Sequence, residues 1–304
     1  MVEVYDLVIL GAGPAGMAAA IYSGRYGMKT LIISKEIGGT ANLAWELENY
    51  PGFSGSGVEL MKKFGEQAKN FGAVFEIGNI DRLEKVENGF KVSVGDKIFV
   101  GCSVISGLGS EHRKLEISGE DKFLGKGVSY CATCDGNFFR GKTVVVIGGS
   151  DSAAKAAIYL AGICEKVYIS YRKEKMRCEQ INLEKIEVIK NIEIIYNSKP
   201  IEIVGDGKVS GLKLGLVNGG EKLIEVGGVF IEIGSTPVTK IFEGLGVELE
   251  EGYIKVDKEG RTSVEGLFAA GDGTSNLFKQ MITATAEGAV AAKTAYDFVK
   301  FGKK

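Results

Sequence analysis

The sequence contains little histidine, proline or tryptophan: one histidine, four prolines and one tryptophan occur in 304 residues. The single histidine, His112, limits the ligands available to a metal ion. The formal net charge of -2 gives no electrostatic reason to expect nucleic acid or a membrane surface as a partner. No run reaches the roughly 18 uninterrupted apolar residues of a membrane span.

The first residues, M-V-E-V-Y-D-L-V, contain no basic segment followed by a long apolar run, and the five cysteines are an odd number. These features predict a cytoplasmic protein, in which a C-x-x-C pair is more often catalytic than structural. Glycine is abundant instead, and 44 glycines predict the tight turns and close backbone approaches of nucleotide-binding folds. The length is sufficient for two domains.

Two cysteines separated by two residues, Cys131 and Cys134, can close a small disulfide ring or open to a dithiol. Asp135 directly follows and could carry a proton to or from a departing thiolate. A zinc site is the alternative, because C-x-x-C is also metal-ligand spacing. Zinc would need two more ligands, and the other three cysteines form no second pair. We therefore predict a redox pair and no metal.

Near the N-terminus an apolar strand leads into G-A-G-P-A-G at 11–16, and a helix is predicted over 17–26. In a dinucleotide-binding turn Gly11 permits the sharp bend, Gly13 lets the backbone reach a pyrophosphate, and Gly16 allows close packing of helix and strand. The phosphates would lie at the positive end of the helix. A glycine turn without a ligand is the alternative, but the flanking strand and helix favour the nucleotide.

The next strand, 29–33, ends at Ser34-Lys35-Glu36. An acidic ligand for the ribose is expected there, and the role is divided between Ser34 and Glu36. Near the C-terminus, Asp272 follows another apolar strand. A carboxylate at the end of a buried strand is costly unless it is paired, so a cofactor hydroxyl is a sensible partner.

A second strand, turn and helix of the dinucleotide kind begins with 142–147 and G-G-S-D-S-A at 148–153. Ser150 stands where the second glycine belongs. A further strand, 166–170, ends in the basic run Y-R-K-E-K-M-R at 171–177. Cations at this point of the unit would hold an adenosine 2′-phosphate; a solvated basic turn is the alternative.

Together these motifs resemble those of the low-molecular-weight thioredoxin reductases, which are FAD-dependent pyridine nucleotide-disulfide oxidoreductases of class II. The resemblance extends from Tyr5 to Val299. It rests on G-A-G-P-A-G at 11–16, E-N-Y-P-G-F at 48–53, G-V-S-Y-C-A-T-C-D-G at 127–136, G-V-F-I at 228–231, F-A-A-G-D at 268–272 and K-Q-M at 279–281.

The resemblance implies an α/β fold of two Rossmann-like three-layer dinucleotide-binding domains, the second inserted into the first. Residues 1–112 and 243–304 would bind FAD, and residues 113–242 would be an NAD(P)H-type domain carrying the cysteine pair. A homodimer and a rotation of one domain against the other are also implied. The expected partner is thioredoxin or a glutaredoxin-like protein, reduced with electrons from NADPH through FAD.

By the same resemblance, Cys134 faces the flavin and Cys131 attacks the thioredoxin disulfide. Asp135 transfers the proton, since His112 lies away from the pair in sequence. The implied FAD site consists of Gly11, Gly13, Pro14, Ala15, Gly16, Ser34, Lys35, Glu36, Gly38, Gly39, Thr40, Asn49, Gly109, Asp272, Lys279, Gln280 and Met281. The implied NADPH site consists of Gly148, Ser150, Asp151, Ser152, Ala153, Arg172, Lys173 and Arg177.

The chain departs from the family pattern at four places. Thr40 replaces a glutamine, and Gly107-Leu108-Gly109 replaces A-T-G, both on the FAD side. Ser150 replaces a glycine, and Y-R-K at 171–173 replaces H-R-R, both on the donor side. The donor therefore stays open among NADPH, NADH, a ferredoxin and a reduced deazaflavin. An FAD-dependent dithiol oxidase and a non-enzymatic redox sensor are the other functions that the residues allow.

Overall fold

The computed structural model describes residues 3–44, 47 and 49–302. The chain divides into two compact units, Met1–Glu111 with Thr236–Lys304, and His112–Ser235. The second unit is thus inserted into the first along the chain. In the part of the chain that the structure describes, no helix is both long and apolar enough to span a membrane.

The first unit contains a seven-stranded sheet in the order β3-β2-β1-β6-β5-β4, with β19 paired to β6. Strands β3, β2, β1, β6 and β19 are parallel, and β5 and β4 add an antiparallel edge. The strands are β1 (Val4–Ala12), β2 (Thr30–Ile37), β3 (Val74–Ile77), β4 (Arg82–Val86), β5 (Gly89–Val94), β6 (Lys97–Ser106) and β19 (Leu267–Ala269). Two short strands, β17 (Leu249–Glu250) and β18 (Tyr253–Ile254), form a separate hairpin.

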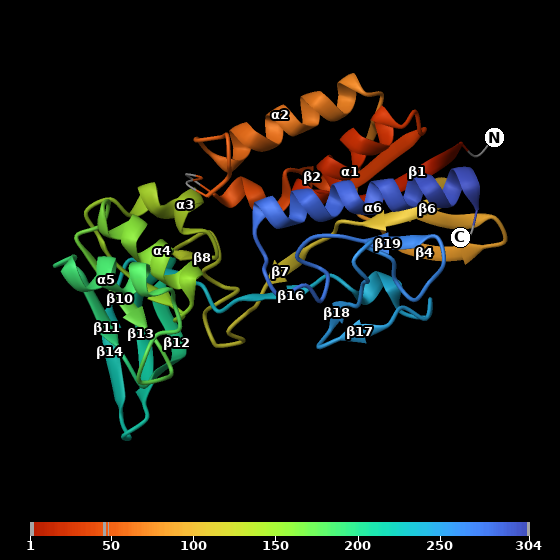
Figure 1. Ribbon diagram of the computed structural model, residues 1–304. Helices are drawn as coiled ribbons and strands as arrows, with labels where there is room; N and C mark the ends of the chain where they lie inside the picture. The colour runs from red at the N-terminus through yellow and green to blue at the C-terminus, as the bar shows by residue number, and fades with distance from the viewer. Residues whose placement is uncertain (1–2, 45–46, 48, 303–304) are drawn as a thin grey trace. The chain divides into compact units, whose positions relative to one another are not determined.

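Strand β1 is buried on both faces, which is why its sequence is an almost continuous apolar run. Leu7 and Ile9 face one core cluster, and Val8 and Leu10 face the other. The first cluster lies under helices α1 (Pro14–Arg25) and α6 (Met281–Phe301), which run alongside each other in Figure 1.

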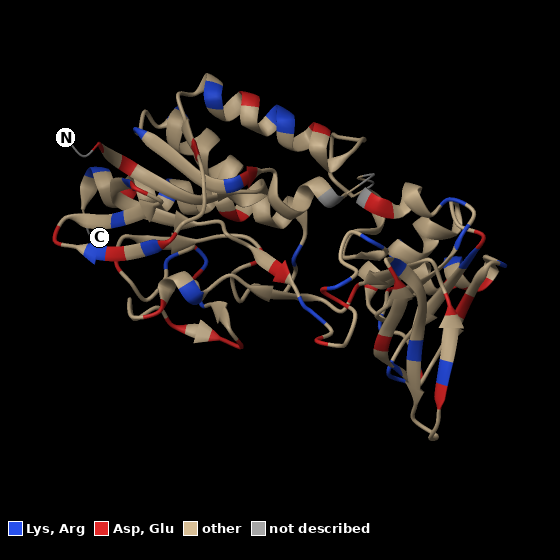
Figure 2. Cartoon of the chain, turned by 180° about the vertical axis from the view of Figure 1, so that it is seen from behind, with Lys and Arg blue, Asp and Glu red and all other residues tan. Residues whose placement is uncertain are grey.

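Helices α1 and α6 are in close backbone contact. A Cβ added to Gly288 would lie 2.0 Å from the carbonyl oxygen of Ala15. The unit also contains helix α2 (Gly57–Asn70), whose first turn is closed by a capping box between Ser56 and Glu59. Lysines and glutamates alternate along α2 in Figure 2. Single 3-10 turns are η1 (Gly39–Leu43) and η3 (Lys240–Phe242).

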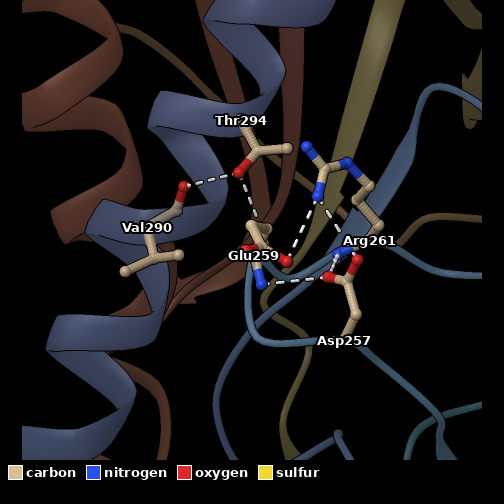
Figure 3. Close-up of polar contacts among 5 residues, drawn as sticks. All are labelled: Asp257, Glu259, Arg261, Val290 and Thr294. Carbon is tan, nitrogen blue, oxygen red and sulfur yellow. Dashed lines mark hydrogen bonds and ion pairs between the residues drawn. The ribbon is translucent and has the colours of Figure 1, made fainter. Parts of the chain in front are cut away.

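A polar turn is tied to the middle of α6 (Figure 3). The Thr294 hydroxyl donates to the carbonyl of Glu259 at 2.7 Å and to that of Val290 at 3.1 Å. Asp257 accepts from the backbone N–H groups of Glu259 and Arg261, at 3.0 and 2.8 Å. The turn is thereby held against the helix that backs the core.

The second unit contains a five-stranded parallel sheet in the order β11-β10-β9-β15-β8. Its strands are β8 (Val128–Ser129), β9 (Thr143–Ile147), β10 (Lys166–Ser170), β11 (Ile192–Ile195) and β15 (Gly228–Ile231). A three-stranded antiparallel sheet consists of β12 (Ser198–Asp206), β13 (Lys208–Leu216) and β14 (Glu221–Glu225). Helical segments are α3 (Ala132–Asp135), η2 (Gly136–Phe139), α4 (Asp151–Ala161) and α5 (Gln180–Val188).

The parallel sheet of this unit is also buried on both faces. Val144 and Val146 of β9 pack in the cluster that includes α4, whereas Val145 and Ile147 pack toward the three-stranded sheet. Figure 1 shows this sheet with α4 and α5 beside it. Strands β7 (Ser110–His112) and β16 (Ser235–Pro237), where the chain passes between the units, pair as a two-stranded ribbon.

Candidate functional site

The redox segment begins directly after β8. The Ser129 hydroxyl accepts a hydrogen bond from the N–H of Cys131 at 2.9 Å and donates to its carbonyl at 3.2 Å. These bonds turn the chain into α3, in which the N–H of Asp135 reaches the Cys131 carbonyl at 3.2 Å. Cys131 is disulfide-bonded, and the side chain of Cys134 lies outside the described part of the structure.

Thr133 lies beside the reactive sulfur. Its Oγ1 is 3.3 Å from Cys131 Sγ, and because a disulfide sulfur carries no proton, the threonine hydroxyl is the donor. Cys102, Cys164 and Cys178 are free thiols. No group of three potential metal ligands occurs among the residues described.

The single histidine is nearer to this segment than its sequence position indicates. The His112 ring stacks on Tyr130, the residue before Cys131, with ring centroids 5.8 Å apart. Burial lowers the pKa of His112, which favours its neutral form. The Tyr130 hydroxyl donates to Glu120, which is 2% exposed and also accepts from the N–H groups of Leu115 and Glu116. This cluster braces the chain just before the cysteine.

The first glycine turn lies at the end of β1. A Cβ on Gly11 would approach Gly107 O to 2.3 Å, and one on Gly16 would approach Gly11 O to 1.9 Å, so packing within the protein requires both glycines. Gly13 differs, because its nearest neighbour would be Gly38 O at 3.8 Å. The protein itself leaves room there for a side chain, so the bare backbone suits the close approach of a ligand.

The start of α1 has the properties of an anion site. Its N-cap residue, Gly13, provides no side-chain hydrogen bond, and no acidic residue is present in the first turn. Free N–H groups and the helix dipole favour a phosphate at such a position. Pro14 begins the helix, and Ala15, its second residue, is buried.

The double glycine after β2 packs against this turn. Gly38 N–H donates to Ala12 O at 2.8 Å, and a Cβ on Gly39 would lie 3.6 Å from Gly13 Cα. Glu36 and Thr40 are exposed nearby, and the Ser34 hydroxyl donates to Glu36 O at 2.7 Å. Lys35 is exposed and forms a surface ion pair with Glu111, with Nζ 3.5 Å from Oε1.

Asp272 follows β19 and the buried Gly271. Burial raises the pKa of its carboxyl, and Lys279 acts in the opposite direction. No described residue donates a hydrogen bond to this carboxylate, so it is available to a ligand hydroxyl. Gly109 lies beside Gly273, the residue after Asp272, because a Cβ on Gly273 would come within 3.1 Å of Gly109 O.

The K-Q-M segment divides into separate roles. Lys279 Nζ donates to the carbonyls of Asp272 and Thr274, at 2.9 and 3.0 Å, and lies 3.2 Å from the centroid of the Tyr253 ring. The lysine therefore holds the loop that carries Asp272. Gln280 accepts from Asn49 Nδ2 at 3.0 Å, which joins two predicted FAD residues from opposite ends of the chain.

Met281 packs against the small cluster beneath η1 and α2.

Another polar contact at this end of the unit could not be predicted from the sequence. The Glu287 carboxylate on α6 accepts from Gly271 N–H at 2.7 Å. It fixes the backbone directly before Asp272. Together with the open Gly13 and the uncapped α1, these residues fit a dinucleotide such as FAD.

The second glycine turn is more crowded. A Cβ on Gly148 would lie 2.1 Å from Glu232 O, and one on Gly149 would lie 2.4 Å from the Tyr171 ring. Ser150 is the N-cap of α4 but makes no capping hydrogen bond. The next residue, Asp151, directs its Oδ1 to Glu179 N–H and Asn182 Nδ2, both at 2.8 Å.

Asp151 is therefore satisfied by α5 and its N-cap. Ser152 is exposed, and Ala153 is fully buried under the turn. The basic residues Arg172, Lys173 and Arg177 are exposed and form no ion pair with any residue that the structure describes. The N–H of Arg177 donates to Gly149 O at 2.6 Å, so the basic loop is fastened to the glycine turn.

The family model of the pyridine nucleotide-disulphide oxidoreductases matches residues 5–288. The thioredoxin reductase of Listeria monocytogenes is 42% identical over 302 residues, which cover 98% of this chain and 95% of that protein. The crystal structure of Lactococcus lactis thioredoxin reductase has a TM-score of 0.93 and 40% identity, covering 97% of this chain and 99% of that one. The T. acidophilum thioredoxin reductase structure has a TM-score of 0.90 and 42% identity, covering 97% and 98%.

A chain with two dinucleotide folds and a redox disulfide has the organisation of a flavin-linked disulfide oxidoreductase. This chain belongs to the pyridine nucleotide-disulphide oxidoreductase family. The predicted resemblance to low-molecular-weight thioredoxin reductases is confirmed, as is the α/β fold class with two Rossmann-like domains.

Proposed function

We propose that this chain is an FAD-dependent thioredoxin-disulfide reductase. It passes two electrons from a reduced donor to the Cys131–Cys134 disulfide and then to thioredoxin or a glutaredoxin-like protein. The observation that carries the proposal is the disulfide-bonded Cys131, held by Ser129 at the start of a short helix, in a chain whose first glycine turn is open to a ligand at Gly13.

The residues for FAD divide between the two ends of the chain. The turn from Gly11 to Gly16 would hold the pyrophosphate, and residues 34–40 would lie along the adenosine. Asp272 would accept from a ribityl hydroxyl, which offsets the cost of its burial. Asn49 and Gln280 would lie at the flavin end. When bound, FAD supplies the two-electron chemistry.

The protein's own part of the reaction is thiol–disulfide exchange. In the reduced pair, the Cys131 thiolate attacks the disulfide of the protein substrate, and one substrate sulfur leaves as a thiolate. The Cys134 thiolate then attacks Cys131 Sγ, which re-forms the pair and releases the second substrate sulfur. Asp135 supplies a proton to one departing thiolate and solvent supplies the other, so the substrate leaves as a dithiol.

NADPH is the proposed donor. The exposed Arg172, Lys173 and Arg177 have no ion-pair partner in the described chain, and their charges suit an adenosine 2′-phosphate. A reduced ferredoxin or deazaflavin is the second candidate. Ser150 favours it, because its side chain stands where the pyrophosphate would otherwise approach bare backbone.

An anaerobic titration that follows flavin bleaching distinguishes these donors. NADPH, NADH and a reduced ferredoxin are added separately to wild-type protein and to Ser150→Gly, and oxidised thioredoxin follows. Bleaching by micromolar NADPH, reversed by thioredoxin, supports the proposal. If only ferredoxin bleaches the flavin, while Ser150→Gly responds to NADPH, the donor is ferredoxin and the second nucleotide site is a relic. Failure to reduce thioredoxin after bleaching by any donor refutes the reductase.

The division into an FAD domain and an NAD(P)H-type domain carrying the cysteine pair is part of the same proposal. A homodimer and a cytoplasmic location are proposed on family resemblance. Light scattering on the purified protein measures the oligomeric state. Oxygen consumption with a small dithiol, in the absence of thioredoxin, tests the alternative of a dithiol oxidase.

A further inference from the structure

A carboxyl group lies at the edge of the second sheet where a nucleotide would be expected. In the order β11-β10-β9-β15-β8, strands β10 and β15 flank β9, so the strand order reverses between β9 and β15. Ligands of open parallel sheets bind outside the carboxyl ends of the strands at this point. The turn from Gly148 to Ser150 follows β9, and Glu232 is the first residue after β15.

Glu232 is in direct contact with the glycine turn. Its N–H donates to Ile147 O at 2.8 Å, and its carbonyl is where a Cβ on Gly148 would clash at 2.1 Å. Side chains alternate along a strand, so Glu232 lies on the face of Phe230, the face that α4 covers. Its carboxyl is therefore on the side of the sheet where the helix begins.

The carboxyl of Glu232 has no protein partner among the residues described. Burial raises its pKa from the ordinary 4.5 to about 7, and no neighbouring charge contributes to the rise. Glu232 is partly buried, and withdrawing a carboxyl from water without supplying a hydrogen-bond donor costs free energy. The chain retains this cost at a position next to the nucleotide turn.

Groups of opposite charge follow the two strands that flank β9. Arg172, Lys173 and Arg177 follow β10 on one side of the turn, and Glu232 follows β15 on the other. A dinucleotide with its 2′-phosphate at these cations and its pyrophosphate at the turn must extend its other half across β9 toward β15. That half is the nicotinamide nucleoside.

We propose that Glu232 recognises the nicotinamide end of the donor. Its carboxyl accepts a hydrogen bond from the carboxamide N–H₂ group and lies at the ring that becomes cationic on oxidation. The reduced nucleotide transfers a hydride, which is two electrons and one proton, to the enzyme's FAD. The carboxylate stabilises the cationic ring that remains. The inference rests on a pyridine nucleotide as donor in the proposed function.

Calorimetric titration of the oxidised, FAD-loaded protein tests this role. The ligands are NADP⁺, which contains the nicotinamide, and adenosine 2′,5′-bisphosphate, which lacks it. The variants are Glu232→Ala, Glu232→Gln and the control Glu225→Gln, an exposed glutamate on β14 of the same unit. Flavin absorbance and circular dichroism verify that each variant is folded.

We expect Glu232→Ala to weaken NADP⁺ by about tenfold to a hundredfold, as for a hydrogen bond to a charged group, and to leave the bisphosphate unchanged. Glu232→Gln should retain part of the affinity, because an amide oxygen still accepts the carboxamide. Arg172→Ala should weaken both ligands, and the control neither.

Three results would overturn the inference, and they are distinguishable. If Glu232→Ala weakens both ligands equally, Glu232 shapes the turn and does not recognise nicotinamide. If it weakens neither ligand, the carboxyl does not contact the nucleotide. If wild-type protein binds neither ligand, the pyridine-nucleotide donor is wrong and this inference fails with it, while thioredoxin reduction by another donor still tests the reductase separately.

Discussion

Replacing Glu232 with glutamine should stabilise the ligand-free protein near pH 8 and have little effect at low pH. Burial raises the pKa of this carboxyl from 4.5 to about 7. Between these values the folded state holds more protons than the unfolded state, so the free energy of unfolding falls as the pH rises. Each pKa unit corresponds to about 1.36 kcal/mol, so the ionised carboxyl costs about 3 kcal/mol above pH 7.

Urea unfolding of the wild type, Glu232→Gln and the control Glu225→Gln at pH 5 and pH 8 measures this cost. The stability difference between Glu232→Gln and the wild type should grow by about 2–3 kcal/mol from pH 5 to pH 8. The control should show no such growth. An equal difference at both pH values would contradict this prediction, because it would mean that Glu232 ionises as an ordinary surface carboxyl does.

Cys134→Ser should keep FAD but lose disulfide reduction, and Cys131→Ser should leave a thiolate that perturbs the flavin spectrum; full thioredoxin-reducing activity in either would contradict the roles. Gly13→Ala should weaken FAD at least about tenfold without impairing folding, because the added Cβ has room. Gly16→Ala should impair folding instead, and equal behaviour of the two would be contrary evidence. Thr294→Val should lower the unfolding free energy by about 1 kcal/mol; an unchanged urea midpoint would show that its hydrogen bonds contribute nothing.

The sequence predicts the two nucleotide folds because their determinants are local. Strands β1 and β9 are buried on both faces, so their sequences consist almost entirely of apolar residues. Each strand ends at a glycine turn. Strand β10 has the bounds predicted for it, Lys166–Ser170. Strand β2 continues to Ile37, beyond the predicted end at residue 33, because it remains paired through Ala12.

Helix α5 was not predicted, because it buries only Asn182 and Ile186 and lacks a marked apolar stripe. Contacts between segments that are distant along the chain could not be predicted from the sequence either. His112 lies beside Tyr130 through ring stacking, although it is distant from the cysteines along the chain. The sequence does show that Glu232 is a single carboxyl within the apolar run V-F-I-E-I. Its position at the nucleotide turn could not be predicted, because it depends on the pairing of β15 with β9.

Counting electrons tests whether a flavin and a redox disulfide act together in this chain. Anaerobic titration with dithionite, followed at the flavin absorbance and by thiol content, needs neither NADPH nor thioredoxin. We expect the wild type to take up four electrons per chain, two by FAD and two by the Cys131–Cys134 disulfide, and Cys134→Ser to take up two. Uptake of two electrons by the wild type, with no new thiols, would contradict this expectation.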